Sequence, residues 1–358
     1  MMRKIRQLLV LAALLPLAGV AGQPPIPAQR LPDLPRPISN NAATALVTED
    51  GVALFSFLGL ESGKQWRDTS SAAFMLAPGA SSWRELPDVP GGEGRLASSA
   101  AAVGGRIYVF GGYTVAADGS EISTPFVHAF DPRSGKYLAR KPIPVPVDDT
   151  VALVSGNRFV YLVSGWHDNG NINLVQFYDT VDDRWSQATP YPGQPVFGHA
   201  GGIAGTTIVI CDGVAIEVSE TDRRRFTPSA ECYRGEIDGA DRRRIEWFRL
   251  APHPGAARYR MAATGVPGRG GWVVFAGGTD NPYNYGGIGY DGQPAEPDSD
   301  IFGYSIAART WRRLGRLEVA TMDHRALLAV DNRFVVVGGM RSGQRVSDTV
   351  LAFQVELP

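Results

Sequence analysis

Cysteine, histidine and net charge are all scarce in this chain, and each shortage argues against a class of function. The 358 residues include two cysteines and five histidines, without the closely spaced histidines that would support a structural zinc site. Lys and Arg (35) nearly balance Asp and Glu (36), so the formal net charge is −1. This balance gives no reason to expect nucleic acid or a membrane surface as a partner. We expect no metal and no cofactor.

Long apolar stretches are also missing, except at the N-terminus. Residues 1–22 combine three basic residues with an apolar run from Leu8 to Leu17. A run of about ten residues is too short to span a bilayer comfortably and is typical of a secretory signal peptide. Small residues place the cleavage after Ala21 or Gly22, and an uncleaved anchor is the alternative. We therefore expect a periplasmic or secreted protein that has no membrane contact after cleavage.

The two cysteines, Cys211 and Cys232, are interpreted in the light of that location. In an oxidising compartment an even number of cysteines most simply forms a disulfide. The bond would close a loop of about 20 residues and stabilise the fold by roughly 3 kcal/mol on a chain-entropy account. Two separate buried thiols are the alternative.

What the sequence does contain is a repeated mark, a short apolar run that ends in a pair of small residues. The clearest copies are Ile107–Gly112, Val273–Gly278 and Val335–Gly339. A second mark, a tryptophan followed by Leu-Pro-like sequence, lies between them, as at Trp83. A unit of roughly 50 residues repeated several times indicates an array or a propeller. Glycine in the pair permits a positive φ and a close approach of the backbone.

Six such units follow one another, and a full unit can be divided into four strands. The sixth unit lacks its fourth strand, and Arg30–Pro35 is a near copy of Glu85–Pro90. We therefore expect this N-terminal segment to complete the last blade and close the ring. The prediction is an all-β, six-bladed propeller that forms a single domain over residues 23–358. The six pairs are Leu58-Gly59, Gly111-Gly112, Ser164-Gly165, Cys211-Asp212, Gly277-Gly278 and Gly338-Gly339.

One face of such a ring is the expected place for a ligand, because two sets of loops converge there over a rigid scaffold. Polar residues occur where the inner strands begin. Aimed at the axis, they would form a ring of donors that suits carboxylates or sugar hydroxyls. The alternative is that they only solvate a central channel. The candidates are Asn41, Asp149 with its neighbour Asp148, His199, Arg260 and His324.

The loop between the second and third strands of unit five has the most unusual local sequence. It places Tyr283, Tyr285 and Tyr290 among Asn, Asp and Gly residues. This combination suits stacking on a sugar ring and hydrogen bonding to its hydroxyls. Trp166 and His167 occupy the matching loop of unit three. The alternative is a structural loop that plugs the mouth with inward-packed tyrosines.

The glycine pairs and spaced tryptophans together resemble the kelch repeat, from about residue 30 to the C-terminus. Among secreted kelch proteins, the chain resembles the periplasmic N-acetylneuraminate epimerases, which are sialic acid mutarotases, most clearly at Phe275–Gly278 and Ser347–Leu351. Arg95 and Arg325 match arginines of that family at the start of inner strands. The galactose oxidase family also uses kelch blades, but its copper site, with histidines, tyrosines and a Tyr–Cys crosslink, finds no match here.

The resemblance to the mutarotases breaks down in unit four. The proposed catalytic glutamate of that family follows an Asn-Gly pair, and its place falls on Gly213 in the stretch Cys211–Gly213. Opening a sugar hemiacetal requires a base and an acid; the candidates are Asp212 or Glu217 with Arg95 or Arg325. Three functions remain open: binding of a carbohydrate or small sugar acid, sugar mutarotation, and a protein-interaction platform without catalysis.

Overall fold

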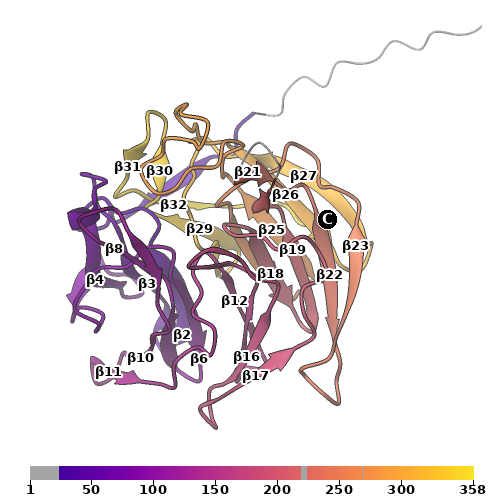
Figure 1. Ribbon diagram of the computed structural model, residues 1–358, viewed down its shortest axis with the longest axis horizontal. Coiled ribbons are helices and arrows are strands. Elements are labelled where there is room, and N and C mark those ends of the chain that lie inside the picture. The colour runs from indigo at the N-terminus through magenta and orange to yellow at the C-terminus, as the bar shows by residue number, and fades with distance from the viewer. Residues whose placement is uncertain (1–23, 219–223, 269) are drawn as a thin grey trace, which may run out of the picture.

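The computed structural model describes residues 24–218, 224–268 and 270–358. It contains six four-stranded antiparallel sheets, the blades, arranged around a central axis (Figure 1). The predicted all-β, six-bladed propeller is confirmed. The predicted signal peptide, residues 1–22, lies outside the described residues. Within the described ranges, no helix is long and apolar enough to cross a membrane.

Each blade runs from an inner strand at the axis to an outer strand at the rim. Blade one is β2 (Ala42–Thr48), β3 (Gly51–Leu60), β4 (Thr69–Leu76) and β5 (Arg84–Leu86). Blade two is β6 (Ser99–Val103), β7 (Arg106–Phe110), β10 (Val127–Asp131) and β11 (Lys136–Ala139). Blade three is β12 (Val151–Ser155), β13 (Phe159–Val163), β16 (Val175–Asp179) and β17 (Arg184–Ala188).

The second half of the ring has the same order. Blade four is β18 (Ala200–Ala204), β19 (Thr207–Cys211), β22 (Cys232–Ile237) and β23 (Ile245–Leu250). Blade five is β24 (Ala262–Val266), β25 (Trp272–Ala276), β26 (Asp300–Ser305) and β27 (Thr310–Arg316). Blade six is β28 (Leu328–Val330), β29 (Arg333–Val337), β32 (Val350–Phe353) and β1 (Ala28–Leu31).

The sixth blade takes its outer strand from the other end of the chain. Strand β1 pairs antiparallel with β32, with Ala28 opposite Phe353 and Leu31 opposite Val350. The N-terminal strand therefore lies where the repeat count predicts. It ends at Leu31, within the segment Arg30–Pro35 on which the prediction was based. This pairing covers the edge of β32, which would otherwise be exposed to other chains.

Short hairpins extend the connection between second and third strands in four blades. They are β8 (Tyr113–Val115) with β9 (Glu121–Ser123), β14 (Trp166–His167) with β15 (Gly170–Asn171), β20 (Val214–Glu217) with β21 (Arg225–Pro228), and β30 (Met340–Arg341) with β31 (Arg345–Val346). Blade one has a 3-10 turn, η1 (Trp66–Asp68), at this place. Blade five has the long tyrosine-containing loop.

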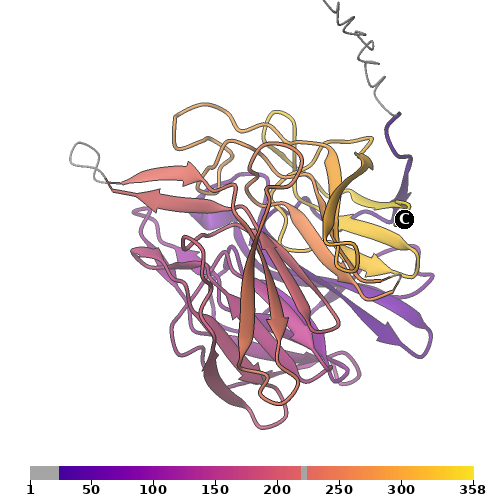
Figure 2. The ribbon, with the colours of Figure 1, turned by 90° about the vertical axis from the view of Figure 1, so that its right-hand side faces the viewer.

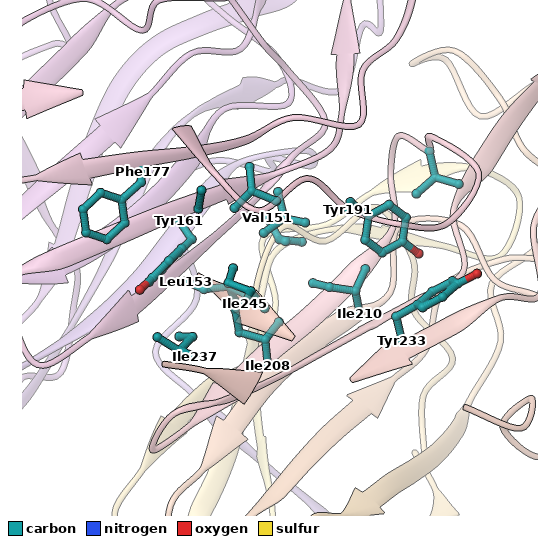
Figure 3. Close-up of a cluster of buried hydrophobic side chains, with 14 of the residues drawn as sticks. Val151, Leu153, Tyr161, Phe177, Tyr191, Ile208, Ile210, Tyr233, Ile237 and Ile245 are labelled. Carbon is teal, nitrogen blue, oxygen red and sulfur yellow. The ribbon is translucent and has the colours of Figure 1, made fainter. Parts of the chain in front are cut away.

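The core lies between neighbouring blades. Figure 3 shows the cluster between blades three and four, where Leu153 and Tyr161 face Ile208 and Ile210, all at most 5% exposed. Burial of each such side chain contributes roughly 1.5–3 kcal/mol. Blades of this kind stabilise one another because each one buries its faces only against its neighbours.

The glycine marks have a common geometric cause in all six blades. The second residue of each pair is a glycine with φ between +84° and +118°. A Cβ at these positions would lie 2.6–3.0 Å from a carbonyl oxygen of the facing inner segment. Only glycine fits such a site. The pair of blade four is therefore Asp212-Gly213, and the sequence-based pair Cys211-Asp212 is wrong by one residue. The six glycines are Gly59, Gly112, Gly165, Gly213, Gly278 and Gly339.

The two cysteines form the predicted disulfide. Cys211 at the end of β19 lies directly opposite Cys232 at the start of β22, and both are fully buried. The bond ties the second and third strands of blade four immediately before the projecting hairpin β20–β21.

Candidate functional site

Six residues before the inner strands form a hydrogen-bonded belt around the axis. All six have positive φ, from +48° at Asp149 to +68° at Asp323. The amide of Asp149 donates to the carbonyl of Ala97, and the belt passes on through Gly198 to Arg260, with N···O distances of 2.8–3.0 Å. The amide of His324 donates to the carbonyl of Arg260, and the amide of Asn40 donates to the carbonyl of Asp323. The amide of Ala97 donates to the Oδ1 atom of Asn40, which completes the belt. The belt consists of Asn40, Ala97, Asp149, Gly198, Arg260 and Asp323.

Four charged side chains meet at this belt and form buried ion pairs with one another. Arg260 donates two hydrogen bonds to Asp149, at 2.7 and 3.1 Å, and a third to Asp323 at 3.0 Å. Arg325 also donates to Asp149. All four side chains are at most 3% exposed. The two positive and two negative charges cancel, so this cluster closes the axis instead of offering free charge to a ligand.

The guanidinium groups also set the charge state of Asp149. Burial acts to raise the pKa of Asp149, but Arg260 and Arg325 outweigh it and hold that pKa below its usual range. Arg260 is further stabilised by its position over two aromatic rings, 4.7 Å from the centroid of Tyr259 and 5.3 Å from that of Tyr283.

A pocket of about 120 Å³, the mouth pocket, lies against this cluster. Aromatic side chains make most of its wall. Trp166 packs edge-on against Phe197 at 5.4 Å, and Phe226 of β21 stacks on Tyr290 of the blade-five loop at 4.0 Å. Segments from blades two to five therefore meet at one point. The lining residues are Tyr113, Glu121, Asp148, Asp149, Trp166, Phe197, Phe226, Arg260, Asn284 and Tyr290.

Within the described residues, two carboxyl groups that line the mouth pocket form no ion pair. Asp148 is 2% exposed and accepts a 2.6 Å hydrogen bond from the hydroxyl of Ser123. Its burial, and then the charge of Asp149, raise its pKa well above the usual range. Glu121 accepts a 2.7 Å hydrogen bond from Asn284, and burial raises its pKa too. Such groups can donate or accept protons, because their neutral forms are favoured.

Four of the predicted ligand-binding residues line this pocket: Asp149, Trp166, Arg260 and Tyr290. Tyr283 is fully buried behind it, where its ring supports Arg260. Tyr285 packs against the apolar cluster that surrounds the mouth, and His167 lies half-exposed on β14. Neither of these two contributes to the lining. The loop therefore combines both expected roles, since Tyr290 faces the pocket and Tyr283 plugs the space beneath it.

The other predicted members of the polar ring do not face the axis, because the belt turns the chain one residue earlier. Asn41 donates to Ser56 inside blade one at 2.8 Å. His199 contacts the carbonyl oxygen of Val163 at 2.9 Å, and His324 contacts Thr321 at 2.6 Å. Burial lowers the pKa of His199 to about 4 and that of His324 to about 3. Both imidazoles are therefore neutral structural groups.

Arg95 and Arg325 are both absent from the mouth pocket. Arg95 is 1% exposed, donates to the carbonyl of Gly111 at 2.6 Å and lies 5.4 Å from the ring centroid of Phe126. Burial lowers its pKa to about 10. Arg325 bonds Asp149 and lines a channel of about 280 Å³ that is formed by the inner strands of all six blades. The Asp149–Arg325 contact therefore separates the mouth pocket from this channel.

Blade four supplies neither of the predicted acid–base groups to the mouth pocket. Asp212 is fully buried and accepts 2.7 Å hydrogen bonds from His253 and from the amide of Arg258, which links blades four and five. Glu217 is exposed at the end of β20, in the hairpin that projects from the body in Figure 2. With the pair corrected to Asp212-Gly213, the residue that follows it is the buried Val214. The mutarotase-type glutamate thus has no counterpart here.

Sequence reasoning missed Glu121 as a pocket residue and did not distinguish Asp148 from Asp149. The signal was local: Glu121 and Ser123 alternate on β9, so both reach the same side as Asp148. In the part of the chain that the structure describes, no group of three or more His, Cys, Asp or Glu side chains gathers in a way that could hold a metal ion.

The fold and the repeats define the class: the chain is a six-bladed β-propeller whose repeats resemble the kelch repeat. No protein-family profile matches it. It is similar to Kelch-like protein 15 of Homo sapiens, 23% identical over 259 residues that cover 71% of this chain and 40% of that protein. It is also similar to Kelch-like protein 36 of Bos taurus, 22% identical over 307 residues, 85% of this chain and 44% of that protein. The chain thus spans less than half the length of these relatives.

A solved structure described as "Structure of YjhT" has the same fold. It matches with a TM-score of 0.71 and 19% sequence identity over 92% of this chain and 99% of that chain. The resemblance to kelch propellers that the glycine pairs and tryptophans predict is therefore confirmed. At this identity the likeness establishes the fold, while the chemistry has to be argued from the pocket.

Proposed function

We propose that this propeller binds a neutral carbohydrate, one sugar ring at a time, in the mouth pocket. The observation that carries the proposal is the combination of an aromatic wall with carboxyl groups that form no ion pair within the described residues. Aromatic faces stack on the apolar face of a sugar, and carboxyl and amide oxygens bond its hydroxyls. Trp166 and Tyr290 supply the faces, while Asp148, Glu121 and Asn284 supply the polar contacts.

The charges of the pocket favour a neutral ligand over a sugar acid. Its single arginine, Arg260, has Nε and both terminal nitrogens already bonded to Asp149 and Asp323. An acidic ligand would meet Glu121 and Asp148 and would find no free cation. The sugar-acid alternative therefore has less support at this site than the neutral carbohydrate.

The volume of the pocket limits the ligand to one ring or less. Sites for drug-sized ligands usually have 300–1,000 Å³, whereas this pocket has about 120 Å³. The blade-five loop that carries Asn284 and Tyr290 forms part of the wall, so a shift of this loop would enlarge the space. We expect a terminal sugar or a single ring, with the rest of a longer saccharide in solvent. A signal peptide would deliver such a binding protein to the periplasm or the outside of the cell.

Isothermal titration calorimetry with matched pairs of sugars tests the proposal. Neutral glucose and galactose are compared with their acids, glucuronate and galacturonate. We expect at least one neutral sugar to bind and its acid to bind more weakly. Trp166→Ala should weaken binding by roughly ten-fold, whereas Leu138→Ala, at an exposed site on β11, should not. Absence of binding by every sugar would overturn the proposal and favour a protein-interaction platform.

A second candidate function, sugar mutarotation, is favoured by one specific observation. Asp148 and Glu121 share one pocket, and burial raises the pKa of each. Exchange between anomers needs one group that takes the anomeric proton and one that protonates the ring oxygen. We propose these two carboxyls for those roles instead of Asp212, Glu217, Arg95 and Arg325.

Anomer exchange by NMR tests this second candidate. A bound sugar from the calorimetric panel is followed in the presence of the wild type, Asp148→Asn and Glu121→Gln. We expect wild-type acceleration and a loss of about 100-fold or more in each variant. If the wild type binds the sugar but exchange stays at the uncatalysed rate, mutarotation is excluded while binding stands.

A further inference from the structure

A second pocket, the blade-six pocket, lies beside the hairpin β30–β31 and the N-terminal strand. Its volume is about 510 Å³, within the range of ligand sites. It shares no lining residue with the mouth pocket. The groups that matter for its chemistry are Arg341, Arg345, Ser347, Thr349, Glu318 and Asp348.

Arg341 is a buried guanidinium whose hydrogen-bonding capacity is mostly unused. It is 8% exposed, and Nη1 makes one long contact, 3.4 Å, to the carbonyl of Ala320. Its Nη2 atom is buried and has no partner among the described residues. Burial lowers its pKa to about 10, without a compensating carboxylate. A buried cation in this condition is costly unless something pairs with it.

Arg345 places a second positive charge on the same face. Arg341 and Arg345 are directly opposite in the β30–β31 register, so their side chains leave the hairpin on one side. Arg345 bonds only the carbonyl of Ser342, at 3.2 Å, and neither arginine makes an ion pair within the described part of the chain. Like charges directly opposite are destabilising. An anion between them would remove both the repulsion and the unused donors.

The acidic residues of the pocket do not fill this role. Glu318 accepts the amide of Ala28 at 3.3 Å, and the nearby Arg30 is paired with Asp33. Ser347 already accepts the amide of Thr349 at 3.1 Å, which leaves its O–H free to donate. The pocket therefore presents guanidinium forks, a hydroxyl donor and carboxylate acceptors.

We propose that the blade-six pocket binds the carboxylate or phosphate group of a small polyhydroxylated ligand. The forks of Arg341 and Arg345 hold the anionic group, because planar guanidinium groups match both carboxylate and phosphate geometry. Glu318 and Asp348 accept hydroxyls of the ligand body. The site is separate from the mouth pocket, so it stands or falls independently of the neutral-sugar proposal.

Calorimetric titration of the full chain with three probes tests this site. Gluconate carries a carboxylate, inorganic phosphate carries the other anionic group, and sorbitol is the neutral match of gluconate. We expect gluconate or phosphate to bind and sorbitol not to bind, and the tighter anion identifies the group that the site takes. Absence of binding by both anions, or equal binding of sorbitol and gluconate, overturns the proposal.

Three variants locate the binding. Arg345→Gln and Arg341→Gln should each weaken anion binding by about ten-fold or more, and Arg345 is exposed, so its variant keeps the fold. Arg312→Gln, an exposed arginine on β27, is the matched control and should bind like the wild type. Anion binding that is unchanged in Arg345→Gln and Arg341→Gln, or lost equally in Arg312→Gln, overturns the assignment to this pocket.

Discussion

The mouth pocket and the blade-six pocket each contain a buried arginine, and they differ in what surrounds it. Arg260 is 1% exposed and bonds two carboxylates through three nitrogens. Arg341 is 8% exposed and has one long carbonyl contact. The same residue type at similar burial is therefore saturated in one place and unused in the other. Saturation indicates a structural role for Arg260, whereas the unused donors of Arg341, in a pocket that also contains Arg345, indicate a ligand.

Removing the charge of Asp149 should have the largest effect on the molecule. Asp149→Asn keeps the shape of the side chain but leaves Arg260 and Arg325 with Asp323 alone. Breaking a buried ion pair by altering one partner costs about 3–5 kcal/mol, so we expect the free energy of unfolding in urea to fall by that amount.

A matched control for this change is Asp118→Asn, in the exposed turn between β8 and β9. We expect it to change stability by no more than about 0.5 kcal/mol. If Asp149→Asn lowered the free energy of unfolding no more than Asp118→Asn does, the charge cluster would not stabilise the fold. Arg260 would then not differ from Arg341 in having a structural role.

Arg341→Met should have the opposite sign. Methionine fills a similar space without a charge, so the unpaired guanidinium and its desolvation cost of about 1–3 kcal/mol both disappear. We expect the free energy of unfolding to stay level or to rise by up to that amount, while gluconate or phosphate binding is lost. A clear loss of stability in the absence of anions would show that Arg341 has structural partners after all.

Asp148 provides a test through pH. Its folded-state pKa is raised above the ordinary value of 3.8, so the folded protein retains a proton that the unfolded chain releases. The stability from this group is present at low pH and is lost as the pH rises through the folded-state pKa. Asp148→Asn should remove that loss, so its stability should decline less toward neutral pH than that of the wild type. Parallel stability curves for the two proteins would contradict the raised pKa.

The fold was predictable because glycine pairs leave a mark that no other residue can replace. Six glycines share a positive φ and a carbonyl within 3.0 Å of the missing Cβ. Blade four was misplaced by one residue because the pair was assigned to Cys211-Asp212, whereas its positive-φ glycine is Gly213. The outer strand of blade six was predictable for a related reason, since the sequence of Arg30–Pro35 is a near copy of Glu85–Pro90 at the outer strand of blade one.

The sites were less predictable because their geometry depends on single backbone torsions. Asp149 and Arg260 were found, but Asn41 and His199 lie one residue past the belt, where the left-handed turn directs their side chains to partners within the blades, Ser56 and Val163. No composition or spacing marks that turn, because Ala97 and Gly198 occupy equivalent places. Glu121 and Arg341 lie on short hairpins whose sequences do not repeat from blade to blade, so only their spatial neighbours identify them.

The smallest predicted effect concerns a single stacking contact in the wall of the mouth pocket. Phe226 of β21 stacks on Tyr290 of the blade-five loop with ring centroids 4.0 Å apart and an interplanar angle of 18°. Phe226→Ala should cost about 1 kcal/mol of stability and weaken sugar binding several-fold, because Tyr290 loses its support. Phe248→Ala, at a 37% exposed site on β23, is the matched control. Since the two pockets share no lining residue, anion binding in the blade-six pocket should be equal in both variants; a joint loss of sugar and anion binding would mean that the two pockets are one coupled site.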